Sequence, residues 1–133
     1  MPALTAFIVE DSPVIRENLI AALEELAPVK VVGTAEDETT ALSWLGADTP
    51  GCDLVIIDIF LKRGSGLGVL RAATQMRKPM SLVVLSNYAT SDMRRKCLEL
   101  GATRVFDKSN EIDALIQYCS HLAEGDTSPA PLA

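Results

Sequence analysis

Polar and charged residues follow short apolar runs at several places along the 133-residue chain. Five of them stand at or just beyond the ends of such runs: Glu10, Asp11, Asp58, Ser86 and Lys108. If these ends meet in the folded chain, three carboxylates, one hydroxyl and one ammonium share a small space. Like charges held so close repel one another, so stability alone does not account for the grouping. We interpret it as a functional site.

The side chains of this group suit phosphoryl transfer. Mg²⁺ takes one or two carboxylates and keeps positions for water and phosphate oxygens, so Glu10, Asp11 and Asp58 are candidate metal ligands. Asp58 is also the candidate nucleophile, because a carboxylate can accept a phosphoryl group to give an aspartyl phosphate. The Ser86 hydroxyl would hydrogen-bond a phosphoryl oxygen, and the Lys108 ammonium would help the metal to neutralise the charge on these oxygens.

Five apolar segments predict the strands that position these residues. Each is short and rich in Val, Ile, Leu or Phe, which is typical of strands buried on both faces. They span residues 5–9, 30–35, 53–58, 81–86 and 103–107. Segments with helical spacing of apolar residues lie between the strands and after the last one. They begin at residue 13, cover about 37–45 and 66–76, and continue at about 90–100 and 112–122.

Local signals mark where several helices begin and end. Ser12 followed by Pro13 predicts the start of the first helix, since a hydroxyl cap before a proline favours that position. Ser109 or Asn110 is predicted to cap the last helix, and Gly101 to end the fourth. Five β–α units in succession predict an α/β fold, with helices on both faces of an open parallel sheet. The site of such a sheet lies beyond the carboxyl ends of its strands.

Composition excludes several classes of protein. A hydrophobic fraction of 48% with 23% charged residues is typical of one globular domain and excludes disorder and coiled coil. No apolar run approaches the roughly 20 residues that span a bilayer, and the N-terminus lacks a signal-peptide pattern. The net charge of 12 − 18 = −6 argues against a nucleic-acid-binding surface. Three widely spaced cysteines predict reduced thiols in a cytoplasmic protein: Cys52, Cys97 and Cys119.

In the types and spacing of these residues, the chain resembles a response-regulator receiver domain of bacterial two-component signalling, with a chemotaxis-regulator-like fold. The resemblance covers about residues 4–124 and rests on the five site residues, on Gly66 and on the turn at 100–102. The spacings 58 − 11 = 47, 86 − 58 = 28 and 108 − 86 = 22 fall where the family has them. The resemblance implies a flavodoxin-like, doubly wound sheet of five parallel strands in the order 2-1-3-4-5 with five helices. It also implies that the backbone carbonyl of Phe60 binds the metal.

The resemblance further implies a switch in a two-component or phosphorelay system. The phosphodonor would be a phosphohistidine on a sensor histidine kinase or a histidine phosphotransfer protein. Phosphorylation of Asp58 would change a surface that binds an unknown downstream protein. Such a domain is not an enzyme in the ordinary sense, because it catalyses only its own phosphorylation and dephosphorylation.

The same resemblance sets the expected domain organisation. We expect residues 1–124 to form the receiver domain and residues 125–133 a flexible C-terminal tail or linker stub. No DNA-binding or catalytic segment follows in the sequence, so we expect a stand-alone regulator, a relay protein or a piece of a longer regulator. The oligomeric state is left open, with a homodimer among the alternatives.

Two departures from the family pattern concern the last strand and the residue after the lysine. The aromatic residue that the family often has three positions before the lysine is replaced by Val105, and Phe106 stands one step on. Side chains of a strand alternate between faces, so we expect the Phe106 ring on the opposite side of the sheet. Ser109 stands where a proline is common, which predicts a trans peptide bond there.

Other departures lie around the predicted phosphoryl group. Asn87 is larger than the residue usual at its position and would narrow the entry to the site. Phe60 and Tyr88 would flank the phosphoryl group, and we predict that their rings hinder an attacking water. Lys62 and Arg63 occupy a loop that often carries a proline and a hydrophobic residue, and they would guide an acidic partner or phosphodonor.

Three alternative functions compete with this interpretation. A receiver-like interaction module that no longer uses phosphate is favoured by Val105 and Asn87, but the intact set of five site residues disfavours it. A phosphatase similar to the haloacid dehalogenases needs an aspartate two residues after its nucleophile, where Phe60 stands. A flavin-binding protein similar to flavodoxin needs a phosphate loop after the first strand, where Glu10 and Asp11 would repel the phosphate.

Three further features receive structural interpretations. Trp44 is expected to pack a helix against the core, and His121 to lie at the surface near the end of the last helix. The basic run at 94–96 is interpreted as a solvated helix face, with a role in partner contact as the alternative.

Overall fold

The computed structural model describes residues 3–47, 51–87 and 89–124. Its strands are β1 (Leu4–Val9), β2 (Val29–Ala35), β3 (Leu54–Ile57), β4 (Ser81–Ser86) and β5 (Arg104–Asp107). Its helices are α1 (Pro13–Leu26), α2 (Glu38–Leu45), α3 (Gly66–Met76), α4 (Ser91–Glu99) and α5 (Ile112–Ala123). Every predicted element is therefore present, close to the expected bounds. The tail predicted at residues 125–133 lies outside the described residues.

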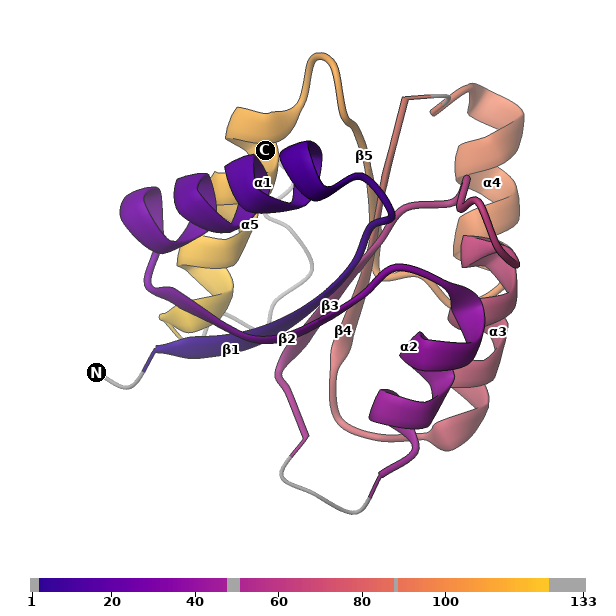
Figure 1. Cartoon of the computed structure of the whole chain (residues 1–133). Coiled ribbons are helices and arrows are strands. Elements are labelled where there is room, and N and C mark those ends of the chain that lie inside the picture. The colour runs from indigo at the N-terminus through magenta and orange to yellow at the C-terminus, as the bar shows by residue number, and fades with distance from the viewer. Residues whose placement is uncertain (1–2, 48–50, 88, 125–133) are drawn as a thin grey trace.

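Neighbouring strands pair in parallel in the order β2-β1-β3-β4-β5, which confirms the predicted sheet. Helices α1 and α5 cover one face of the sheet, and α2, α3 and α4 cover the other (Figure 1). The chain leaves β1 toward β2 on one side and later returns to β3 on the other side of β1. The strand order therefore reverses at the carboxyl ends of β1 and β3, where open α/β sheets bind their ligands.

Side chains along the strands alternate between two hydrophobic cores. In β1, Phe7 and Val9 belong to the core beneath α2, α3 and α4, whereas Ala6 and Ile8 belong to the core beneath α1 and α5. All four residues of β3 are buried, because helices cover both faces of the sheet. Burial of this apolar surface is the main force that holds the helices on the sheet.

The β5 strand places its two central side chains on opposite faces, as predicted. Val105 lies in the core beneath α2, α3 and α4. Phe106 lies in the other core, where its ring centroid is 6.0 Å from that of Tyr118 in α5. The aromatic side chain of β5 therefore faces away from α4.

The predicted packing role of Trp44 and the predicted absence of disulfides among the three cysteines are confirmed. The Trp44 ring stacks on Phe7 with the ring centroids 4.1 Å apart, which fastens α2 to the sheet. All three cysteines are free and buried. Burial raises the pKa of the Cys52 thiol to about 11 and that of Cys119 to about 12, so both stay protonated at neutral pH.

In four of the five helices, the side chain of the N-cap residue accepts a hydrogen bond from a backbone amide of the first turn. At α1, the Ser12 hydroxyl accepts a hydrogen bond from the Ile15 amide at 3.3 Å and Pro13 is the first helical residue, as predicted. The other three are capped by Asp37, Ser65 and Thr90. Gly101 follows α4 with a φ of 113°, a left-handed conformation that favours glycine, and so confirms the predicted helix end.

The predicted cap of α5 is wrong, although the helix begins at residue 112, as expected. Neither Ser109 nor Asn110 caps the helix; the N-cap position is Glu111, without a side-chain capping bond. The reason is a turn that precedes the helix. The amides of Ser109 and Asn110 both donate to Asp107 Oδ1, at 2.7 and 3.2 Å, so both residues belong to a turn that ends before the first helical residue, Ile112.

Gly66, the first residue of α3, packs against the backbone that carries Asp58. A Cβ added here would overlap the Asp58 carbonyl oxygen and would lie 2.6 Å from Ile59 Cα. We therefore expect Gly66→Ala to lower the free energy of unfolding by about 1–3 kcal/mol, because backbone cannot move aside as a flexible side chain can. Urea unfolding measures this change.

Gly51→Ala is the matched control, because a Cβ at Gly51 would meet no atom within 4 Å. We expect that variant to stay within about 0.5 kcal/mol of the wild type. Equal stabilities for the two variants would contradict the packing seen at Gly66.

Candidate functional site

The carboxyl ends of the strands bring the predicted site residues to one edge of the sheet. Glu10 and Asp11 follow β1, Asp58 follows β3, Ser86 ends β4 and Lys108 follows β5. One carboxylate oxygen from each of Glu10, Asp11 and Asp58 lies within 4.8 Å of the other two. Glu10, Asp58 and Ser86 are buried, and Asp11 is half-buried. The expected grouping is therefore present, and the roles of its members stay predictions.

The Lys108 ammonium lies between two of the carboxylates. Its Nζ atom is 2.7 Å from Glu10 Oε1 and 3.2 Å from Asp58 Oδ2. The side chains of Lys108, Glu10 and Asp58 expose only 11%, 3% and 10% of their surfaces, so these ion pairs are shielded from solvent. The Lys108 amide also donates to the Ser86 carbonyl at 2.9 Å, which joins the residue after β5 to the end of β4.

Burial and charge act in opposite directions on these groups. Burial raises the pKa of Asp58; the Lys108 ammonium opposes the rise and the Glu10 carboxylate adds to it. Burial also works against the charge of Lys108, but the hydrogen bond to Glu10 and the attraction of both carboxylates outweigh it and raise the pKa of Lys108. When all four groups are ionised, the site carries 1 − 3 = −2 charges, which a divalent cation would balance.

Backbone amides orient the carboxylates. Each of the three accepts one such hydrogen bond: Glu10 from Ser12 at 3.1 Å, Asp11 from Lys62 at 2.7 Å and Asp58 from Phe60 at 3.3 Å. Lys62 and Phe60 belong to the β3–α3 loop, which comprises residues 58–65. This loop therefore contributes to the orientation of two of the three carboxylates.

Three residues that depart from the family pattern, Phe60, Asn87 and Ser109, lie in the segments that follow β3, β4 and β5. The Phe60 side chain is 52% exposed. The Ser109 hydroxyl donates to Asn87 Oδ1 at 3.4 Å, which links the segments that follow β4 and β5. All peptide bonds among the described residues are trans, as predicted for the one before Ser109. Tyr88 lies outside the described residues, so its place beside the phosphoryl group stays a prediction.

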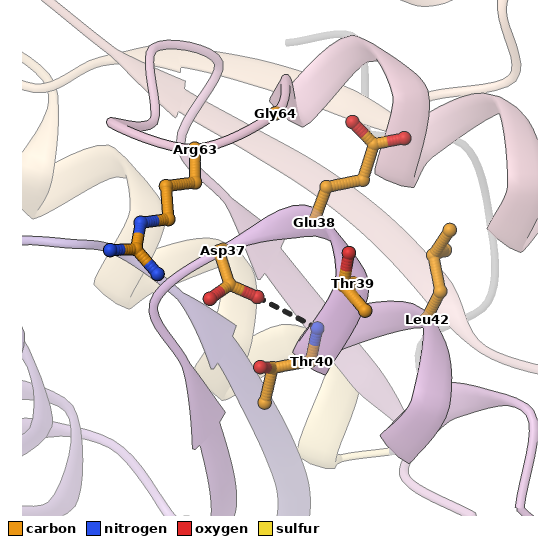
Figure 2. A pocket seen from close by; sticks show the side chains of 7 residues that line it. All are labelled: Asp37, Glu38, Thr39, Thr40, Leu42, Arg63 and Gly64. Atoms are coloured by element: carbon orange, nitrogen blue, oxygen red, sulfur yellow. Dashed lines mark hydrogen bonds between the residues drawn. The ribbon is translucent and has the colours of Figure 1, made fainter.

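Arg63 lines a hollow on the α2 side of the β3–α3 loop. The hollow has a volume of about 430 Å³ and is formed by Asp37, Glu38, Thr39, Thr40, Leu42, Arg63 and Gly64. Figure 2 shows the Arg63 side chain above the start of α2, where Asp37 Oδ1 accepts a hydrogen bond from the Thr40 amide at 2.8 Å. A guiding role for Lys62 and Arg63 toward an acidic partner stays a prediction.

The basic run at 94–96 is solvated only in part. Arg95 fits the prediction, since it pairs with Asp92 at 2.8 Å and both side chains are well exposed. Lys96 is exposed as well, and His121 lies exposed near the end of α5, as expected.

Arg94 does not fit the prediction of a solvated residue. Its guanidinium donates to the Ala89 carbonyl at 2.9 Å, to the Val105 carbonyl at 3.0 Å and to Glu111 Oε1 at 2.6 Å. Glu111 Oε1 also accepts a hydrogen bond from the Asp107 amide at 2.8 Å. One side chain thus joins the segment after β4 to β5 and to the start of α5. The sequence held no signal that separates Arg94 from its basic neighbours.

This five-stranded sheet with an acidic cluster at its carboxyl edge defines a receiver domain. The response regulator receiver domain family matches residues 6–120 of the chain. The chain therefore belongs to the receiver domains of two-component response regulators, as its sequence predicts.

Comparison with known proteins agrees with this assignment. A protein-glutamate methylesterase/protein-glutamine glutaminase from Anaeromyxobacter dehalogenans (strain 2CP-C) is 32% identical over 103 residues, which make up 76% of this chain and 28% of that protein. The chain thus spans less than a third of the length of this relative.

Solved structures show the same fold. The signal receiver domain of NarL from Mycobacterium tuberculosis superposes with a TM-score of 0.81 at 23% identity and covers 94% of this chain and 99% of its own. A structure of the CheX–CheY–BeF3–Mg²⁺ complex from Borrelia burgdorferi gives a TM-score of 0.76 at 21% identity, over 86% of this chain and 84% of that one. In the described part of the present chain, no helix is long and apolar enough to span a membrane.

The ion pair between Arg94 and Glu111 makes the stability depend on pH. The hydrogen bond from Arg94, followed by that from the Asp107 amide, holds the pKa of Glu111 below its ordinary value of 4.5. A carboxyl whose pKa is lower in the folded state stabilises the fold above its unfolded pKa, and this contribution is lost as the pH falls through the folded pKa. We expect Glu111→Gln to lower the free energy of unfolding at pH 7 by about 1 kcal/mol or less, because the pair is partly exposed.

Urea unfolding over a pH series tests this expectation. The difference between wild type and Glu111→Gln should shrink as the pH falls below 4.5, the ordinary pKa of the group. Glu25→Gln, at an exposed position of α1, is the control for loss of a carboxylate. A difference that grows on acidification would contradict the assigned ion pair.

Proposed function

We propose that this domain accepts a phosphoryl group on Asp58 and thereby switches a partner-binding surface. The observation that carries the proposal is the position of the Lys108 ammonium, which lies within hydrogen-bond distance of both Glu10 and Asp58 beside a cluster of three carboxylates. A buried group of three acids and one ammonium is costly to hold unless further charge balances it. A divalent metal ion provides that balance, and together with the Lys108 ammonium it would also offset the negative charge of an incoming phosphoryl group.

The donor set fits Mg²⁺. Three carboxylates whose oxygens lie within 4.8 Å of one another supply hard ligands and an excess of negative charge. Glu10, Asp11 and Asp58 would hold the ion together with the Phe60 backbone carbonyl, the last by analogy with the family. When bound, Mg²⁺ would neutralise charge on the phosphoryl oxygens as the group is transferred.

The transfer step assigns roles to three residues of the site. A carboxylate oxygen of Asp58 attacks the phosphorus of a phosphohistidine; the new O–P bond forms as the P–N bond breaks, and the imidazole leaves. Lys108 stabilises the negative charge on the phosphoryl oxygens, and the Ser86 hydroxyl donates a hydrogen bond to one of them. Hydrolysis later returns the Asp58 carboxylate and inorganic phosphate. No other side chain needs to form a bond to the substrate.

The switch acts through the segments that follow Ser86 and Lys108. A phosphoryl group that engages both residues favours one of two conformations of the domain, and the favoured conformation presents a different surface of α4, β5 and α5. The proposed phosphodonor is a sensor histidine kinase or a histidine phosphotransfer protein, and the proposed output is contact with a downstream protein.

Intact mass measured after incubation with Mg²⁺ and acetyl phosphate tests the proposed phosphoacceptor. We expect one phosphoryl adduct in the wild type, and none without Mg²⁺ or in Asp58→Ala. If no adduct forms, titration with beryllofluoride and Mg²⁺ decides, because some receiver domains accept phosphate only from their kinase. Absence of both responses would favour a phosphate-independent interaction module instead.

Replacement of Phe60 tests whether its ring protects the aspartyl phosphate. The side chain stands two residues after Asp58 and is 52% exposed at the mouth of the site. We expect Phe60→Asn to shorten the half-life of the phosphorylated protein several-fold, because a smaller polar side chain admits the attacking water. Loss of the adduct with time, followed by mass, gives the half-life.

Leu98→Asn is a control for the loss of an exposed apolar side chain, since Leu98 is 51% exposed on α4. Its half-life should equal that of the wild type. If Phe60→Asn also leaves the half-life unchanged, the ring does not hinder hydrolysis.

A further inference from the structure

Glu38, the first residue of α2, contacts the β3–α3 loop. Its Oε1 atom accepts a hydrogen bond from the Ser65 amide at 2.8 Å, and its own amide donates to the Arg63 carbonyl at 3.3 Å. Glu38 is half-buried, and its side chain lies between α2 and the loop (Figure 2). A hydrogen bond to a charged acceptor is stronger than one between neutral groups, so this contact restrains the loop.

Two glycines make room for the Glu38 side chain. A Cβ at Gly64, whose φ is 82°, would lie 2.5 Å from Glu38 Cβ, and a Cβ at Gly68 would overlap the Glu38 carboxylate. The carboxylate therefore fits closely into a space that the absence of side chains at these two positions provides.

The same loop also contacts the carboxylate cluster. The Lys62 amide donates to Asp11 Oδ2 at 2.7 Å, and the Phe60 amide donates to Asp58 Oδ1 at 3.3 Å. Five consecutive residues, 61–65, separate Phe60 from the start of α3 at Gly66. A displacement of the loop at Ser65 is therefore transmitted over a short stretch of backbone to the amides that orient two of the proposed metal ligands.

We propose that Glu38 is a positioning residue for the divalent cation: it fixes the β3–α3 loop so that Asp11, Asp58 and the Phe60 carbonyl are arranged before the ion binds. This role rests on the proposed function, since it presupposes that the cluster binds Mg²⁺. Prearranged ligands bind more tightly because less conformational freedom is lost on binding. Glu38 itself stays outside the set of ligands.

Glu38 also has a purely structural role that the test must separate from this one. A carboxylate in the first turn of a helix stabilises that helix through its dipole, so removal of Glu38 weakens α2 whatever happens at the metal site. Thermal stability alone therefore does not distinguish the two roles. The two roles are distinguished by the affinity for Mg²⁺, together with the hydrogen exchange of the loop amides in the absence of metal.

Calorimetric titration of the full chain with Mg²⁺ alone tests the proposal. We expect Glu38→Ala to raise the Kd for Mg²⁺ about five- to tenfold, and Glu38→Gln to raise it less, because the amide oxygen still accepts from Ser65. Glu25→Ala, which removes the same charge from an exposed position of α1, should leave the Kd unchanged. Hydrogen exchange at residues 62–65 without metal should be faster in Glu38→Ala than in wild type.

Gly68→Ala provides a second variant that keeps Glu38 and displaces its carboxylate. We expect it to raise the Kd in the wild-type background and to have no effect in the Glu38→Ala background, where the obstructing carboxylate is gone. This non-additivity is the signature of a direct coupling between the two positions. A weakened α3 does not account for a higher Kd in Gly68→Ala, because alanine is a better helix former than glycine.

The outcomes separate this inference from the proposed function. If wild type binds Mg²⁺ and Glu38→Ala binds it with the same Kd, Glu38 does not position the site, and the proposed function stands. If wild type neither binds Mg²⁺ nor forms the phosphoryl adduct, the proposed function fails, and this inference fails with it.

Discussion

The contact on which the site depends is the one between the Lys108 ammonium and the carboxylates of Glu10 and Asp58. It joins residues that are 98 and 50 positions apart in the chain, at 2.7 and 3.2 Å. These carboxylates are buried, and an unpaired charge in such surroundings costs several kcal/mol. The Lys108 ammonium therefore bridges the ends of β1, β3 and β5, and the parallel sheet is the framework that makes the contact possible.

A second constraint comes from the backbone around the cluster. Carboxylates that repel one another keep fixed positions only if other groups orient them, and here each accepts a hydrogen bond from a backbone amide. Two of these amides belong to the β3–α3 loop, so the conformation of that loop is part of the site. The close packing of Gly66 against the Asp58 carbonyl and the contact of Glu38 with Ser65 restrain the same loop from α3 and α2.

The sequence predicts the elements and the site residues because both depend on local patterns. Apolar runs mark the strands, and polar residues at the ends of these runs mark the site, whereas the strand order came from family resemblance. The cap of α5 was mispredicted because Ser109 and Asn110 form a turn with Asp107, whose side chain accepts from both of their amides, and a list of favourable capping residues does not reveal such a turn. The roles of Arg94 and Glu38 depend on contacts with distant segments, which periodicity does not encode.

The two faces of β5 show how one shift in sequence changes the chemistry of a surface. Because Phe106 rather than Val105 carries the ring, the aromatic packing of this strand lies beneath α1 and α5. On the other face, the segment after β4 is joined to β5 and to the start of α5 by the Arg94 guanidinium. On the α4 face of β5, where the family often has an aromatic ring, these segments are thus joined by an ion pair and hydrogen bonds. Such a connection depends on the ionisation of Glu111 and on salt, whereas aromatic packing depends on neither.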